Sequence, residues 1–243
     1  MVFFWNKIKR WWHRLSSPVH FYHFAGKHLS WTGILAVICY ITGLVWGLGF
    51  APADYQQGNS FRIIYLHVPA AALSMGIYVS MAICCMVGLI WKIKLAFMVA
   101  RSLAIIGAVF TFIALFTGSV WGKPTWGTWW VWDARLTSEL ILLFLYLGFL
   151  GLNQALPDRN IANKSSAILA IVGVINIPII HYSVIWWQSL HQGSTILKFS
   201  KPSISAEMLW PLLIMLLAFS LIVVSYVFLN TRTQILNQRL RRA

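Results

Sequence analysis

The chain has 243 residues, of which 59% are hydrophobic and 10% are charged, and its formal net charge is +14. A soluble domain of this size cannot hide so much apolar side chain from water, so the composition excludes an ordinary soluble protein and indicates one that lies in lipid. The positive charge would make nucleic acid a natural partner of a soluble protein, but membrane topology accounts for it here, and we expect no nucleic-acid binding.

Six apolar runs are long enough to cross a membrane as helices. A helix rises about 1.5 Å per residue and the hydrocarbon layer is about 30 Å thick, so about 20 apolar residues suffice. The predicted fold class is therefore all-α, a polytopic integral membrane protein with one six-helix domain over 31–230. A basic amphipathic segment, 1–30, precedes this domain, and a basic tail, 231–243, follows it. The runs lie at about 31–50, 67–91, 98–120, 137–156, 166–187 and 208–229.

Lysine and arginine are distributed unevenly among the segments that connect these runs. Cytoplasmic loops retain positive charge, whereas translocated loops are depleted of it. With the N-terminus inside, all but five of the nineteen lysines and arginines fall in cytoplasmic segments. We therefore expect both termini to be cytoplasmic and the loops 51–66, 121–136 and 188–207 to be external. The five basic residues on the external side are Arg62, Lys123, Arg135, Lys198 and Lys201.

Two features precede the second span. Residues 1–14 mix aromatic and basic side chains, which is typical of a helix that lies on anionic lipid, so membrane lipid is an expected partner. The first span is followed by Ala51-Pro52-Ala53, which resembles a signal-peptidase site. Its apolar run is longer than a signal peptide normally has, and about 30 residues precede it. We therefore expect an uncleaved first helix.

The most informative segment is the predicted external loop 121–133. An interfacial belt would explain one or two of its tryptophans, because tryptophan is enriched where headgroups meet acyl chains. Five in one loop, which glycine and proline bend tightly, indicate a shaped aromatic surface instead. Such a surface suits a large, planar, apolar ligand, and haem is the candidate. The five tryptophans are Trp121, Trp126, Trp129, Trp130 and Trp132.

Histidines that could ligate haem iron are predicted at the same depth in the membrane. His67 precedes Pro69, and proline fits the first turn of a helix, so His67 should lie at the outer edge of the second span. His191 lies just beyond the fifth span, close to Trp186 and Trp187. We expect His67 and His191 to be the two axial ligands of the iron.

Charged residues near the outer ends of the spans complete the predicted site. Arginine can bind a carboxylate through two hydrogen bonds, so Arg62 and Arg135 are candidate contacts for the haem propionates. The alternative is that each arginine reaches lipid phosphate. Asp133 would either orient an iron-ligating imidazole or neutralise Arg135, and the sequence leaves both roles open.

One further histidine lies deeper in the fifth span. We expect His181 to have a structural role, because a polar residue within a span usually pairs with another polar group. Glu139, near the outer end of the fourth span, is expected to face the interior of the bundle for the same reason. The candidate partners of His181 are Asn176, Tyr182 and Glu139.

Together these motifs resemble the haem exporter protein C family of bacterial cytochrome c maturation. The likeness extends over about 49–194 and is carried by four segments. It implies membership of a wider superfamily of haem-handling proteins marked by the tryptophan-rich loop, called the WWD domain. The two haem-ligating histidines of the family match His67 and His191. The four segments are 49–60, 62–70, 121–140 and 176–194.

The resemblance implies a haem-binding delivery protein of the bacterial inner membrane rather than an enzyme. Haem b would be bound at the outer face and passed to a membrane-anchored periplasmic haem chaperone (CcmE-like). Further implied partners are a small single-span subunit (CcmD-like) and the ATPase and permease subunits of an ABC transporter (CcmA- and CcmB-like). Two alternatives stay open: a b-type haem protein of electron transfer, whose ligands should lie within the bundle, and a transporter that moves haem through its own helices.

Overall fold

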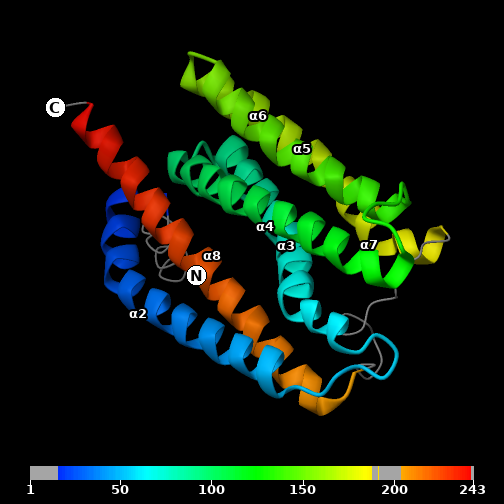
Figure 1. The fold of residues 1–243 in the computed structure, drawn as a ribbon. Helices are drawn as coiled ribbons and strands as arrows, with labels where there is room; N and C mark the ends of the chain where they lie inside the picture. Colours follow the sequence, from blue (N-terminus) through cyan, green and yellow to red (C-terminus); the bar gives the residue numbers. More distant parts are fainter. Residues whose placement is uncertain (1–15, 188–190, 192–203, 242–243) are drawn as a thin grey trace, which may run out of the picture.

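The computed structural model describes residues 16–187, 191 and 204–241, and its helices run in similar directions through one bundle (Figure 1). Within the described residues, six helical stretches are long and apolar enough to cross a membrane. The all-α class and the number of candidate spans are therefore confirmed. The elements are α2 (Pro18–Val45), the π-helical turn η1 (Trp46–Phe50), the 3-10 turn η2 (Asn59–Ile63), α3 (Ile64–Trp91), α4 (Lys94–Trp126), α5 (Ala134–Ala155), α6 (Arg159–Gly173), α7 (Asn176–Trp186) and α8 (Ala206–Leu240).

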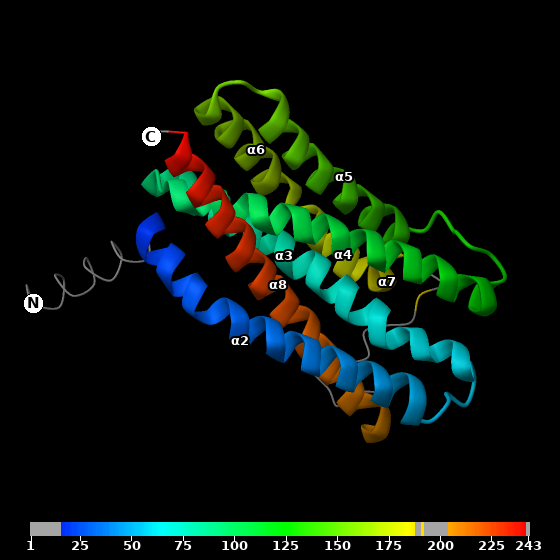
Figure 2. The same cartoon turned by 60° about the vertical axis from the view of Figure 1, so that its left-hand side comes forward.

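The helices pack as two groups that meet along α3 and α4. Helix α2 packs along α8, while α5 contacts α4, α6 and α7. Figure 2 shows the start of α2, the α3–α4 turn, the α5–α6 connection and the end of α8 at one end of the bundle. The opposite end carries 51–58 and 127–133, and we call it the tryptophan end. The described parts of the loops predicted to be external therefore lie together.

Helix α2 begins at Pro18, well before the expected start of the first span at 31. The side chain of Ser17 caps it by accepting from the backbone N–H of His20, and Pro18 occupies the first helical turn, where its missing N–H costs nothing. The apolar run only marks the part of a helix that lipid can cover. Residues 1–15 of the predicted interfacial segment, most of 188–207 and the last two residues of the tail lie outside the described residues.

Two helices near the tryptophan end are longer than the sequence indicated. Helix α3 begins at Ile64, so Pro69 lies inside it rather than in its first turn, and His67 is already helical. Helix α4 continues through Trp126 and ends at Gly127, whose φ of 78° lies in the left-handed region that glycine adopts without strain. The irregular part of the predicted loop 121–133 is thus only 127–133.

The fifth span consists of two helices, because α6 ends at Gly173 and α7 starts at Asn176. At this break the Asn176 side chain donates to the carbonyl of Ser138 on α5, at 2.8 Å, which ties α7 to α5. The buried core lies between α3, α4 and α5. There the Tyr146 hydroxyl donates to the carbonyl of Ser74 at 2.7 Å, beneath the site described next.

Candidate functional site

A hollow of about 400 Å³, part of it open to solvent, lies near the tryptophan end among α3, α4, α5 and α7. Its walls are largely apolar. Four side chains with polar groups also line it, contributed by α3, by α5 and by the segment after α7. They are His67, Arg135, Glu139 and His191. The structure thus brings both predicted iron ligands and one of the two predicted propionate contacts to one hollow.

Three residues of α4 surround the ring of His67. Its Nδ1 lies 3.0 Å from the hydroxyl oxygen of Thr117. Its Cε1 faces Gly118, where an added Cβ would lie only 3.1 Å away. Its ring also meets Trp121 edge to face, with the two ring centroids 5.6 Å apart. The imidazole is therefore fixed on one side by α4. Its other edge is the part that can contact a ligand in the hollow.

His191 is held from the start of α5. Asp133 is the N-cap of that helix: one carboxylate oxygen accepts from the backbone N–H of Leu136, and the other lies 2.8 Å from His191 Nδ1. Burial lowers the pKa of the His191 imidazole below its ordinary value, and the Asp133 carboxylate opposes this shift. A neutral imidazole is the form that binds a metal. Both roles open for Asp133 have a counterpart in the structure, since its carboxylate contacts the His191 imidazole and also interacts electrostatically with Arg135.

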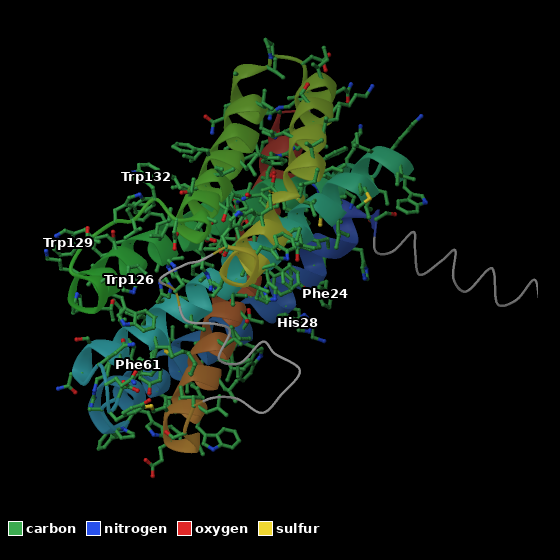
Figure 3. The ribbon with its side chains drawn as sticks, turned by 90° about the vertical axis from the view of Figure 1, so that its right-hand side faces the viewer. Phe24, His28, Phe61, Trp126, Trp129 and Trp132 are labelled. Carbon is green, nitrogen blue, oxygen red and sulfur yellow. The ribbon has the colours of Figure 1, made fainter. Side chains whose placement is uncertain are left out.

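The five tryptophans divide into two sets. Trp121 and Trp126 belong to the last turns of α4 and contact the two histidines, since the ring of Trp126 lies 4.6 Å from that of His191. Trp129 and Trp132 are 57% and 75% exposed, and Figure 3 shows them outside Trp126 at the rim of the same end. Trp130 packs against Trp132 with ring centroids 5.4 Å apart, and its indole N–H is buried and finds no acceptor within the described part of the chain.

The two predicted propionate contacts have different surroundings. Arg135 lines the hollow one helical turn before Glu139. Arg62 instead donates to the carbonyls of Leu48 and Ala51, and so holds the end of η1. The structure does not bring Arg62 to the lining of the hollow. An arginine near the expected headgroup depth can donate to the carbonyls of a helix end or bind a ligand. Sequence spacing does not tell which of these it does.

Glu139 and Asn176, two of the expected partners of His181, bond to other residues. The Glu139 carboxyl is bonded to the hydroxyl of Ser74 at 2.7 Å on the floor of the hollow, and Asn176 is bonded to α5. His181 meets only the ring of Tyr182 among its three expected partners, with the ring centroids 4.8 Å apart. Glu139 faces the interior, as predicted, and is 7% exposed.

Two supporting residues were not anticipated from the sequence. Thr117 contacts His67, and Gln57 accepts a hydrogen bond of 2.7 Å from the indole N–H of Trp121. Each joins parts of the chain that are 50 or 64 residues apart. Threonine within an apolar helix and glutamine in a polar loop carry no local signal of these contacts.

Comparison with known sequences assigns a family. The profile described as "Heme exporter protein C" matches residues 11–243. The chain belongs to this family. It is similar to Heme exporter protein C of Escherichia coli K12, with 53% identity over 95% of this chain and 93% of the relative. The protein of the same name from Haemophilus influenzae is 50% identical over 96% and 95%, and that from Bradyrhizobium diazoefficiens is 43% identical over 93% and 86%.

In this member of the heme exporter protein C family, the lining of the hollow fits the needs of a haem. Within the described residues, no three side chains among histidine, cysteine, aspartate and glutamate gather closely enough to hold a metal ion. Two imidazoles supply two ligands, which is what an iron already held by four porphyrin nitrogens requires. The apolar walls suit the macrocycle, and Arg135 suits an acidic substituent.

Proposed function

We propose that this protein binds haem b in the hollow through His67 and His191 and delivers it to a membrane-anchored periplasmic haem chaperone during c-type cytochrome maturation. The observation that carries the proposal is that both imidazoles line one hollow, and that each has an oxygen partner at Nδ1. A partner at one ring nitrogen orients an imidazole for ligation through the other. The names of the relatives agree with a role in haem export.

The proposed division of labour follows from position. His67 and His191 hold the iron, and Arg135 pairs with a propionate. Trp121 and Trp126 cover part of the macrocycle, because both already pack against the histidines. Coordination of the iron by the two imidazoles would provide much of the affinity for haem. The chain itself binds and orients its cargo and has no chemical step of its own in this proposal.

Delivery requires that part of the haem stay accessible to an acceptor. The rim formed by Trp129, Trp130 and Trp132 with Asp133 is the surface proposed to cover haem and to meet the chaperone, and the high exposure of Trp129 and Trp132 supports it. The same rim would lie at the outer face of the inner membrane, as the lysine and arginine distribution supports. The single-span subunit and the ABC transporter subunits are the remaining proposed partners.

The proposal is tested by haem uptake and transfer. The full chain, purified in detergent and titrated with haemin, should take up one haem and develop the absorption spectrum of a six-coordinate low-spin haem. Addition of the periplasmic haem chaperone should then move the haem into the chaperone fraction. Failure to take up haem would contradict the binding proposal. Uptake that is followed by reversible redox cycling with quinol, and by no transfer, would favour an electron-transfer protein instead.

The two arginines provide a matched pair of variants. Arg135→Gln removes a charge-assisted bond worth about 1.5–3 kcal/mol, so haemin affinity should fall roughly 10-fold or more. Arg62→Gln should leave the affinity nearly unchanged and lower the thermal unfolding temperature, because its guanidinium holds the carbonyls at the end of η1. Haemin titration and thermal unfolding of both variants measure this. An equal loss of haemin affinity in the two variants would contradict this distinction and indicate that Arg62 also contacts a propionate.

A further inference from the structure

The tautomer of His67 follows from the direction in which the Thr117 hydroxyl donates its proton. The Thr117 hydroxyl lies 2.6 Å from the carbonyl oxygen of Ile113, one turn earlier in α4. A carbonyl oxygen can only accept, so the single hydroxyl proton of Thr117 points to it. The Thr117 oxygen must then accept from His67 Nδ1, 3.0 Å away. His67 therefore carries its proton on Nδ1, and Nε2 keeps the lone pair that can bind iron.

The surroundings of His67 leave it little choice of orientation. Thr117 is 8% exposed, and its hydroxyl is held against the helix backbone. The imidazole edge lies close to Gly118, where an added Cβ would be 3.1 Å from Cε1 and would require the ring to shift. Trp121, whose indole is itself held by Gln57, closes the next position on the same face of α4. A ring flip would carry Nδ1 away from the Thr117 hydroxyl and break this hydrogen bond.

The corresponding partner of His191 differs in charge. Asp133 accepts from a backbone N–H with one oxygen and contacts His191 Nδ1 with the other. Acceptance from a helix N-terminus favours the ionised carboxylate. A hydrogen bond to a carboxylate is roughly twice as strong as one between neutral groups and makes the imidazole a stronger donor to a metal. The Thr117 hydroxyl, being neutral, gives His67 less of this effect.

We propose that Thr117 is the positioning residue of His67, and that its neutral hydroxyl makes His67 the weaker of two unequal iron ligands and the one released first when haem is handed on. This inference rests on the proposed haem-binding function. Two equally strong ligands would retain haem too long for delivery, because tight binding is mainly slow release. An unequal pair keeps haem attached through His191 while one coordination position opens to the acceptor.

The binding rate of carbon monoxide to the reduced haem protein tests the inequality. Carbon monoxide can bind only after one axial histidine leaves, so its rate reports the weaker ligand. Thr117→Val should raise this rate roughly 10-fold, the lower end of the cost of losing a partner of a ligating histidine. Thr117→Ser keeps the hydroxyl and should behave as the original protein. Asp133→Asn keeps the N-cap oxygen of α5 but loses the acceptor of His191 Nδ1, and it should raise the rate less than Thr117→Val does.

Thr111→Val is the matched control for the loss of a hydroxyl. Thr111 is buried in the same helix and donates to Gly107 at 2.8 Å, as Thr117 does to Ile113, but it does not contact His67. Its variant should therefore leave the rate unchanged. Acceleration by Asp133→Asn without acceleration by Thr117→Val would overturn the inference, since His191 would then be the weaker ligand. Equal acceleration by both, or by neither, would also overturn it.

A measurement without haem separates this inference from the proposed function. Nitrogen-15 NMR of histidine-labelled, haem-free protein distinguishes a protonated from an unprotonated ring nitrogen, and a His67→Gln sample identifies the signal. We expect His67 to be protonated at Nδ1 alone, and Thr117→Val, but not Thr117→Ser, to introduce the other tautomer. Protonation at Nε2 in the unaltered protein would refute the positioning role even if haem binds. If haem does not bind, this result still stands or falls on its own.

Discussion

Purified protein with alanine in place of both His67 and His191 is expected to carry no haem. Both imidazoles line the hollow, and without them its described lining keeps apolar walls and one arginine but no histidine to bind the iron. The loss of affinity should exceed the roughly 10- to 100-fold cost of removing only the partner of a ligating histidine. Each single variant should retain some haem with an altered spectrum, because the other imidazole is still present. Absorption spectra of the purified proteins measure this.

His181→Ala is the control for the double histidine variant. His181 lies on α7, next to Ile180 of the hollow's lining, and its ring packs against Tyr182. Its loss should leave the spectrum and the haem content unchanged. Identical spectra for the unaltered protein and the double variant would contradict the ligand assignment. A changed spectrum only in His181→Ala would place the ligands deeper in the bundle, as in an electron-transfer protein.

Much of the fold could be predicted, because each span needs about 20 apolar residues and the chain offers six such runs. Helix ends were less accessible to prediction. Ser17 and Pro18 start α2 before the apolar run, and Gly127 ends α4 after it. These caps act on backbone groups beyond the lipid-facing part of a helix, where hydropathy gives no information. At Pro69 a local signal gave the wrong helix start. The proline was expected in the first turn of a helix, but α3 begins at Ile64, directly after η2, so Pro69 lies inside it.

The site was predictable where residue type alone carries the chemistry. Histidines and clustered tryptophans near the outer ends of the apolar runs indicated which residues should lie together. The structure brings His67 and His191 to one hollow. The hydrogen-bond partners were not predictable. Thr117 and Gln57 reach residues at least 50 positions away, and Arg62 donates to carbonyls whose location depends on the turn between η1 and α3. Such contacts follow from helix packing and not from local sequence.

The packing beneath the hollow leads to a second large effect. A Cβ added at Gly107 of α4 would overlap the buried ring of Tyr146 on α5. This ring has little freedom to move, because its hydroxyl donates to the carbonyl of Ser74 and the ring packs edge to face with Tyr78, with centroids 5.0 Å apart. Overpacking of this kind costs about 1–3 kcal/mol, so Gly107→Ala should lower the thermal unfolding temperature by roughly 2–12 °C.

The same substitution should reach the haem site, because Ser74 links Tyr146 to Glu139 on the floor of the hollow. Gly107→Ala is therefore expected to weaken haemin binding as well as to destabilise the protein. Gly76→Ala is the matched control: Gly76 also lies within a helix, and a Cβ there would meet nothing within 4 Å. This control should unfold at the original temperature or slightly above it, since alanine favours a helix over glycine. Equal unfolding temperatures for the two variants would show that α4 and α5 do not pack as closely as described, and unaltered haemin affinity in a destabilised Gly107→Ala protein would separate the core from the site.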